Sequence, residues 1–240
     1  MAEGRRHRGA HPDDARLFGE AALPTLRRAA EEVVWLLGRG YPMAPAVAAV
    51  GGHHQLEQRQ RVALGRALCS PERRAARRAS AIGAELAAGK TVSIDGFNLI
   101  ILLEVALSRG VVLEGWDGAP RDLAGLRGSY RLVEETERAI DLAGGALAAL
   151  GVAGARFLLE RMVSNSGRLR ALLVERARDW PLRVEVEMVA NADPILAREP
   201  LVVTGDAAIL DRCPSWLNLG QLIIAESIGD AWRVDFLPRD

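Results

Sequence analysis

The stretch TVSIDGFNLIILLE, residues 91–104, decides how we expect most of the chain to fold. It starts as a β-rich run, passes through Asp95 and Gly96, and continues as an apolar segment of helical length. This order predicts a strand, a tight turn and a helix, because glycine tolerates backbone angles that other residues resist. The carboxylate of Asp95 is then placed at the carboxyl end of the strand, the edge where open α/β sheets bind ligands.

A second stretch, LVVTGDAAILD at residues 201–211, repeats this design. Two valines are expected in a buried strand, Thr204 and Gly205 end it, and Asp206 and Asp211 follow. Two strands that bring carboxylates to one edge make an oxygen-rich site suited to Mg²⁺ or Mn²⁺. The two stretches together predict a metal site, and they say less about the reaction.

The composition, with 49% hydrophobic and 26% charged residues among 240, is typical of a globular protein that buries a full core. The polar, basic beginning is unlike a signal peptide, and no apolar run reaches the roughly 18 residues that span a bilayer. We therefore expect a cytoplasmic protein with no membrane partner. Cys69 and Cys213 lack metal-ligand spacing and are expected to be inert thiols.

Charge is distributed unevenly along the chain although the net charge is zero. Residues 1–90 contain 14 Arg and one Lys against nine acids, whereas residues 91–240 contain 16 Arg against 22 acids. The change of sign coincides with the first expected strand, so we predict a basic helical domain at 1–89 and an α/β domain at 90–240. A basic module beside an acidic one suits a nucleic-acid enzyme. A general preference for arginine over lysine is an equally good explanation.

The basic part shows helical periodicity at residues 15–22, 24–38, a short segment through 49, and 55–68. The last two, joined by a turn, are compatible with a DNA-reading pair of helices that carries Arg59 and Arg61. A basic bundle that packs on its neighbour or contacts phosphates is the alternative. Arg73 and Arg74, in the Ala/Arg-rich run at 71–88, belong either to a phosphate-binding face or to a solvated one.

From residue 91 the periodicity alternates between strands and helices. Strands are expected at 92–94, 111–113, 156–159, 184–189, 201–204 and 232–236, and helices at 99–108, 130–150, 167–179, after 193, and at 207–211. The predicted fold class is α/β, with a Rossmann-like, mainly parallel sheet covered by helices on both faces.

Acids follow most of these strands, and parallel strands would place them on one edge. They are Asp95, Asp117, Asp122, Glu160, Asp193, Asp206 and Asp211. Clustered carboxylates repel one another, so a bound cation would stabilise them. We predict metal binding at Asp95, Asp117, Asp206 and Asp211 and a catalytic role for Glu160, whereas helix capping suffices to explain Asp122 and Asp193.

The segment SNSGRL at residues 164–169 lies between a strand and a helix. Ser164, Asn165 and Arg168 could bind a phosphate at the start of the helix, although an ordinary helix cap is the alternative. Arg121 is a further candidate for substrate binding, with a structural salt bridge as the alternative. The adjacent pair His53 and His54, outside the acidic part, is interpreted as a surface turn.

Several other chemistries find little support in the sequence, because their motifs are missing. The sequence has no GxxxxGK or GxGxxG phosphate loop, no HExxH zinc motif and no GxSxG nucleophile elbow.

The motifs SIDGFN and VVTGDAAILD resemble those of the PIN-like nuclease superfamily, in particular members whose first strand ends in D-G-x-N. This resemblance implies a Rossmann-like sheet whose strand-end acids hold Mg²⁺ or Mn²⁺ and cleave RNA. By position, Asp95 and Asn98 match the D-G-x-N motif, and Thr204 and Asp206 match the T-x-D element. Asp211 corresponds to a following acid.

The acid that the superfamily usually supplies from a helix has several candidates here, which are Glu134, Glu135, Asp117 and Glu160. The whole chain also resembles an uncharacterised prokaryotic family with a helical amino-terminal part. Its shared elements include HRGAHPDD, DGFN, GSYR and SNSGRL.

The leading hypothesis is a metal-dependent ribonuclease that hydrolyses RNA phosphodiesters, with DNA as an open alternative substrate. Asp95, Asp206, Asp211 and Glu160 would be catalytic, while Asn98 and Thr204 would help to bind the substrate. The alternatives are an inactive module that binds nucleic acid or protein, and a phosphohydrolase that acts on small phosphate esters. The sequence leaves a homodimer open.

Overall fold

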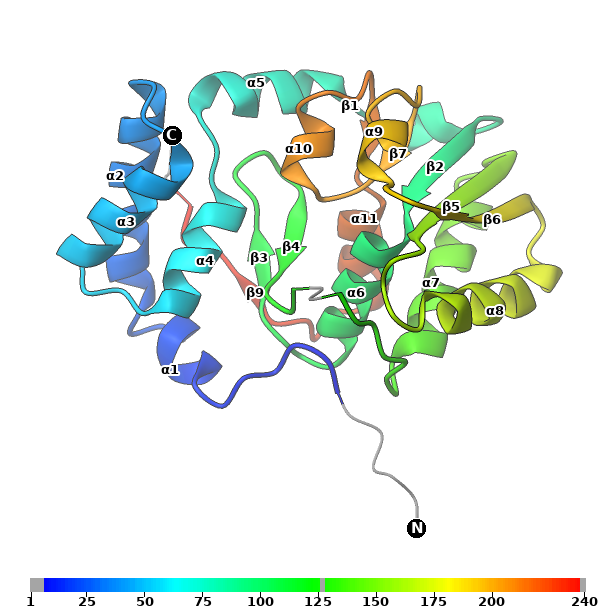
Figure 1. Cartoon of the computed structure of the whole chain (residues 1–240), viewed down its shortest axis with the longest axis horizontal. Coiled ribbons are helices and arrows are strands. Elements are labelled where there is room, and N and C mark those ends of the chain that lie inside the picture. Colours follow the sequence, from blue (N-terminus) through cyan, green and yellow to red (C-terminus); the bar gives the residue numbers. More distant parts are fainter. Residues whose placement is uncertain (1–6, 126–127, 238–240) are drawn as a thin grey trace, which may run out of the picture.

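The structure is a computed structural model that describes residues 7–125 and 128–237. Its first part is helical, as the sequence predicts, and lies on the left of Figure 1. It contains α1 (Asp14–Phe18), α2 (Leu23–Gly38), α3 (Met43–His53) and α4 (Gln58–Ala67). A fifth helix, α5 (Pro71–Ser80), runs across the top of Figure 1 from this helical part toward the sheet.

The main sheet has six parallel strands in the order β1-β8-β7-β2-β5-β6. In that order they are β1 (Ala81–Ile82), β8 (Trp216–Leu217), β7 (Val202–Val203), β2 (Thr91–Asp95), β5 (Gly154–Glu160) and β6 (Arg183–Val189). The central strands are apolar because both faces of the sheet are buried. The prediction of an α/β fold with a parallel sheet is confirmed.

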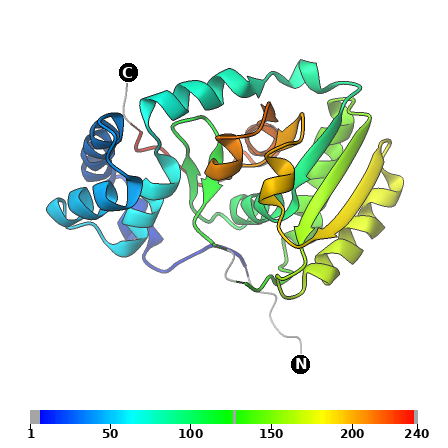
Figure 2. The same ribbon diagram turned by 45° about the horizontal axis from the view of Figure 1, so that its top comes forward.

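Helices lie against both faces of the sheet (Figure 2). The larger core lies between the central strands and α6 (Gly96–Leu107), α7 (Thr136–Ala149), α8 (Ser166–Arg176) and α11 (Leu219–Ser227). A smaller core on the other face includes α9 (Asp193–Leu196) and α10 (Ala207–Leu210), with Trp216 and Val202 at its centre. Two short 3₁₀ turns lie at Ala84–Ala87 and Ala177–Asp179.

The strand expected at 111–113 does not belong to the main sheet. As β3 (Val112–Glu114) it pairs antiparallel with β4 (Pro120–Asp122) and parallel with β9 (Arg233–Val234), forming a separate small sheet. Asp117 therefore lies in the β3–β4 turn, and our expectation that it follows a strand of the main sheet is wrong. Apolar periodicity identifies a strand but does not say which sheet it joins.

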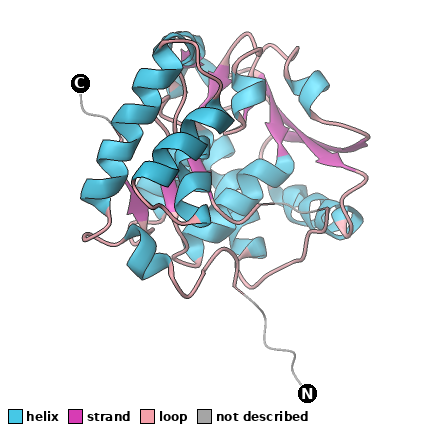
Figure 3. Ribbon diagram, turned by 60° about the vertical axis from the view of Figure 1, so that its left-hand side comes forward, coloured by secondary structure: helices cyan, strands magenta, loops and turns pink. Residues whose placement is uncertain are grey.

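The last described residues, up to 237, return to the helical part, whose helices come forward in Figure 3. Leu113, Trp116, Val234 and Phe236 pack into the core formed by α2, α3 and α4. The helical core is thus completed by residues from far along the chain, and β1 joins the main sheet before the predicted boundary at 89. No helix among the described residues combines the length and the apolarity needed to cross a membrane.

Candidate functional site

A pocket of about 370 Å³ opens at the carboxyl edge of the main sheet, between the sheet and the helical part. Its acidic wall comes from the ends of β2 and β5 and from the starts of α9 and α10, and α4 contributes to the opposite wall. The polar side chains that line it are Arg66, Asp95, Asn98, Arg121, Asp122, Glu160, Asp193 and Asp206.

Asp95 is the last residue of β2 and the N-cap of α6. Its Oδ1 accepts a hydrogen bond from the Asn98 backbone N–H at 3.2 Å, and its Oδ2 accepts one from Thr204 Oγ1 at 3.1 Å. The pKa of Asp95 is raised to about 7, chiefly by burial and also by the nearby carboxylates of Asp206 and Asp193, while the two hydrogen bonds oppose the shift. The folded protein thus holds a carboxyl group that a neighbouring cation would favour in its ionised form.

Thr204 connects the two strand ends. Its hydroxyl donates to Asp95 and accepts the backbone N–H of Asp206 at 3.0 Å. The β2–β7 pairing of Ile94 with Val203 puts Asp95 beside Thr204, so the parallel register itself brings the two motifs together. This contact confirms that the first two stretches meet in space, as the sequence predicts.

Asn98 and Gly205 form a second link between the two motifs. The Oδ1 of Asn98 accepts the Gly205 backbone N–H at 2.6 Å. A Cβ atom at position 205 would lie 2.9 Å from the carbonyl oxygen of Pro120 and 3.3 Å from Asn98 Oδ1. Glycine is therefore required here because any side chain would separate the two motifs.

Asp206 begins α10 and uses Oδ1 to accept the backbone N–H groups of Ala208 and Ile209, at 2.8 and 3.1 Å. Asp193 begins α9, and burial together with the charge of Asp206 raises its pKa, against the opposing charge of Arg212. Helix capping thus accounts for one oxygen of Asp206. It leaves the clustering with Asp95 and Asp193 unexplained.

No Arg, Lys or His within residues 7–125 and 128–237 forms an ion pair with Asp95 or Asp206. This donor set fits Mg²⁺ or Mn²⁺, which prefer carboxylate and water oxygens. Among the same residues, no three of the pocket carboxylates have oxygens within 4.8 Å of one another. Any ion here would therefore be held by one or two carboxylates and by water, as is usual for Mg²⁺.

Asp117 and Asp211 are in a different situation. The buried Arg77 of α5 donates to Asp117 Oδ2 and to Asp211 Oδ1, both at 2.7 Å, and Arg121 binds both oxygens of Asp117, at 2.8 and 2.7 Å. Although burial raises the pKa of Asp117, the hydrogen bonds and charges of Arg121 and Arg77 lower it overall. Neither acid lines the pocket, so the geometry does not support our prediction that they bind the metal.

The wall opposite the acids carries a guanidinium from the helical part. Arg66 of α4 donates to the carbonyl oxygen of Asp122 at 2.6 Å, and its side chain is 37% exposed. Arg121 also lines the pocket, but its Nε donates to the Gly205 carbonyl at 2.9 Å and its other nitrogens bind Asp117. Arg121 therefore fixes the position of the Gly205 turn, the role that we gave as the alternative to substrate binding.

The segment at 164–169 lies outside the set of described residues that line the pocket. The Asn165 side-chain amide donates to the Tyr130 carbonyl at 2.9 Å, and Ser164 exchanges backbone hydrogen bonds with Gly128 and Tyr130. These contacts join the start of α8 to the 128–130 loop, while Arg168 is exposed. The geometry favours the structural alternative for this segment.

The four arginines expected to bind nucleic acid are placed as follows. Arg59 pairs with the buried Asp14, Arg61 donates to the carbonyls of Leu56 and Gly51, and Arg73 approaches Asp211 at 3.1 Å. The guanidinium of Arg74 lies 4.5 Å from the ring centre of Trp116. Arg59 and Arg61 thus stabilise the helical part, whereas Arg73 leaves 65% of its side chain accessible although it approaches Asp211.

Arg66 is the pocket residue that the sequence analysis missed. It sits in an ordinary helical segment 56 residues before its partner Asp122, and no motif marks it. Asp193 was assigned to capping alone, yet it lines the pocket with the other acids. The rule that strand-end acids share one edge had included Asp193, and only the capping explanation set it aside.

Comparisons with known proteins identify a family for this chain, and the matching descriptions name no activity. Residues 84–222 match the family described as "Domain of unknown function (DUF5616)", which covers more than half of the chain, and the chain belongs to this family. Residues 25–79 match "Protein of unknown function (DUF434)". The chain is 27% identical over 186 residues to the uncharacterized protein MJ0935 of Methanocaldococcus jannaschii, covering 78% of this chain and 89% of that protein. No solved structure matches the chain.

Proposed function

We propose that this protein is a metal-dependent ribonuclease with a PIN-like fold, acting at the carboxyl edge of its main sheet. The observation that carries the proposal is the cluster formed by Asp95, Asp193 and Asp206, which has no ion pair at Asp95 or Asp206 among the described residues. The charge of Asp206 raises the pKa of both Asp95 and Asp193, and such a group of carboxylates is unfavourable unless a cation joins it. The resemblance of the D-G-x-N and T-x-D motifs to nuclease motifs supports the same conclusion.

Asp95 and Asp206 would hold Mg²⁺ or Mn²⁺, with Glu160 and Asp193 reaching it through water. The bound ion would activate water for in-line attack on a phosphodiester and stabilise charge on the leaving oxygen. Thr204 and Asn98 keep the two strand ends together and so fix the distance between the two main ligands. Arg66, which lines the opposite wall, would contact a phosphate oxygen of a substrate that lies between the two walls.

The size of the pocket bears on the substrate. A volume of about 370 Å³ is at the lower end of the range for small-molecule sites and holds one nucleotide rather than several. This observation keeps a phosphohydrolase acting on small phosphate esters as the second candidate. In a ribonuclease, the neighbouring nucleotides would run outside the pocket.

The test is cleavage of a labelled RNA oligonucleotide by the purified protein with Mn²⁺, alongside the variant Asp206→Asn. Asparagine keeps the helix cap of α10 but removes the negative charge, so we expect cleavage to fall by a factor of about 100 or more with the fold intact. Mononucleotides and phosphate monoesters are tested in parallel, and their hydrolysis in place of RNA cleavage would identify the small-ester phosphohydrolase.

The matched control is Asp211→Asn, which removes a carboxylate five residues away that Arg77 already neutralises. We expect this variant to retain cleavage within a few-fold of the wild type. Equal cleavage by wild type and Asp206→Asn would indicate a contaminating nuclease and reject the proposal. Binding of RNA without cleavage by either protein would favour the inactive binding module.

A further inference from the structure

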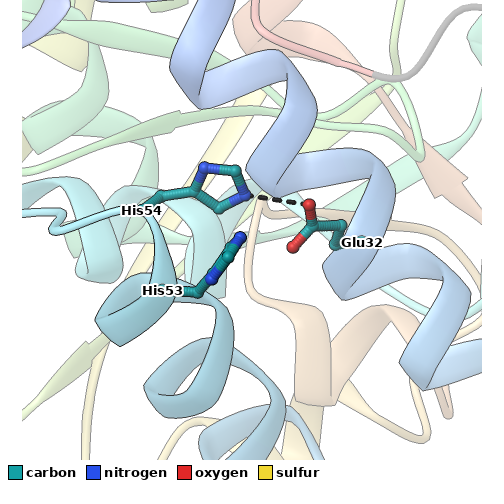
Figure 4. Close-up of side chains that lie close together, drawn as sticks. All are labelled: Glu32, His53 and His54. Atoms are coloured by element: carbon teal, nitrogen blue, oxygen red, sulfur yellow. Dashed lines mark hydrogen bonds and ion pairs between the residues drawn. The ribbon is translucent and has the colours of Figure 1, made fainter.

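A group of histidine and glutamate side chains, the types that ligate metals, lies in the helical part, away from the pocket at the sheet edge. Glu32 of α2 and His53 and His54 at the end of α3 bring their ligand atoms within 4.8 Å of one another. Figure 4 shows both imidazole rings beside the Glu32 carboxylate. We interpreted the histidine pair as a surface turn from the sequence, because Glu32 is more than twenty residues away and no local pattern connects it to the pair.

The geometry is close to what a tetrahedral ion needs. The Nε2 of His54 is 2.9 Å from Glu32 Oε1, and the two rings are nearly perpendicular, at 79° with centroids 4.8 Å apart. Ligands at the usual zinc distances stand about 3.3 Å from one another, so a small rotation of the exposed His53 would complete the set. The ion would take the place of the proton that His54 and Glu32 share.

The backbone that carries these ligands is well fixed. Helices α2 and α3 pack together through Val33, Val47 and Val50, and Arg61 of α4 donates to the carbonyls of Gly51 and Leu56 on either side of the pair. The pair also sits at the carboxyl end of α3, where the helix dipole favours positive charge. Ordering the ligands before the ion arrives lowers the entropic cost of binding.

We propose that Glu32, His53 and His54 form a binding site for a borderline divalent cation such as Zn²⁺. Two imidazoles and one carboxylate are the ligand set that suits Zn²⁺, Co²⁺ and Ni²⁺, whereas Mg²⁺ and Mn²⁺ prefer the all-oxygen pocket at the sheet edge. Three protein ligands leave one position for water or an external ligand. The ion links α2 to α3 and stabilises the helical part.

The experiment is calorimetric titration of the full-length Asp206→Asn protein with Zn²⁺, which keeps the acidic pocket from contributing. We expect one site per chain, weakened at least tenfold by His54→Ala and by the near-isosteric Glu32→Gln. Saturation with Zn²⁺ at about 100 times the dissociation constant should raise the melting temperature by about 5–10 °C.

The matched control is Glu31→Gln, which neutralises the adjacent exposed acid of α2 and should leave Zn²⁺ affinity within twofold. Trp35, 58% exposed and one turn after Glu32, gives a second readout, because bound Co²⁺ should quench its fluorescence and Trp35→Phe should remove that quenching. Circular dichroism without metal checks that each variant folds. Zn²⁺ binding that is absent from the parent, or unchanged by both His54→Ala and Glu32→Gln, would overturn the proposal.

Discussion

Two sets of aspartates in this protein follow the same sequence pattern and end in opposite environments. Asp95 and Asp206 face the pocket without an ion pair among the described residues, while Asp117 and Asp211 are held by Arg77, with Arg121 also on Asp117. The difference comes from the buried guanidinium of Arg77 on α5, which binds Asp117 and Asp211 but not the pocket aspartates. A strand-end acid is therefore a candidate metal ligand only when no arginine already neutralises it.

The arginine-bound aspartates, Asp117 and Asp211, help to hold the parts of the fold together. Arg77 binds Asp117 in the β3–β4 turn, Asp211 and the Ala207 carbonyl at α10, and its own carbonyl accepts the Trp216 indole N–H at 2.7 Å. One residue thus joins the helical part, the small sheet and the main sheet. Because buried charges are costly without partners, this arrangement holds only while all its members are present.

The largest expected effect comes from breaking the contacts of the arginine-bound aspartates. Arg77→Met leaves Asp211 short of a partner and Asp117 with Arg121 alone, so we expect a loss of about 3 kcal/mol in the free energy of unfolding. Urea denaturation measures it. Arg73→Ala, which removes the exposed partner of Asp211, should change stability by less than about 0.5 kcal/mol, and equal effects of the two variants would contradict the structural role of Arg77.

Removing a charge from the pocket aspartates should raise the stability of the metal-free protein, whereas Arg77→Met lowers it. Burial first, and then the charges of Asp206 and Asp193, raise the pKa of Asp95 from its ordinary 3.8 to about 7. Between these values the folded state binds a proton that the unfolded state has lost, so the stability of the metal-free protein falls as pH rises through this window. Asp95→Asn removes this penalty and keeps the cap of α6.

We therefore expect metal-free Asp95→Asn to be more stable than the wild type at pH 8, by about 1–3 kcal/mol, and to differ little at pH 4. Denaturant melts with a chelator at the two pH values measure the difference. Asp117→Asn serves as the comparison, because loss of a carboxylate with a lowered pKa should destabilise the protein at pH 8. If metal-free Asp95→Asn is instead less stable than the wild type at pH 8, the negative charge of Asp95 is stabilised by an interaction other than those described, and the argument fails.

The smallest effect is expected outside the pocket. Arg168 is exposed on α8 and does not line the pocket, so Arg168→Ala should change kcat/KM for RNA by less than about twofold. Arg66→Ala, on the pocket wall, should lower kcat/KM by about tenfold or more through the lost phosphate contact. A larger loss of kcat/KM in Arg168→Ala than in Arg66→Ala would indicate that the 164–169 segment binds the phosphate.

The sequence could predict the parts of this structure that depend on local pattern. The end of β2 at Asp95, the Thr204–Gly205 turn and the starts of most helices follow from apolar periodicity, glycine and capping chemistry. Parallel pairing then brings Asp95 and Asp206 to one edge, because every strand of such a sheet ends on the same side. This reasoning needs no knowledge of distant contacts.

The remaining features depend on contacts that no local pattern encodes. Arg77 lies 40 residues before Asp117 and 134 before Asp211, and nothing in the Ala/Arg-rich run distinguishes it from its exposed neighbours. The two-residue strands β1 and β8 are too short for periodicity to reveal, and α11 was not expected. The same limit explains why β3 was assigned to the wrong sheet.

The contrast between the pocket aspartates and the arginine-bound aspartates is tested most directly by titrating wild type, Asp206→Asn and Asp211→Asn with Mn²⁺ at pH 7.5. Electron paramagnetic resonance of the free ion measures how much Mn²⁺ each protein binds. We predict that Asp206→Asn weakens Mn²⁺ binding by a factor of about 100 while Asp211→Asn stays within about threefold of the wild type. Equal weakening by the two substitutions, or undiminished binding by Asp206→Asn, would contradict the account.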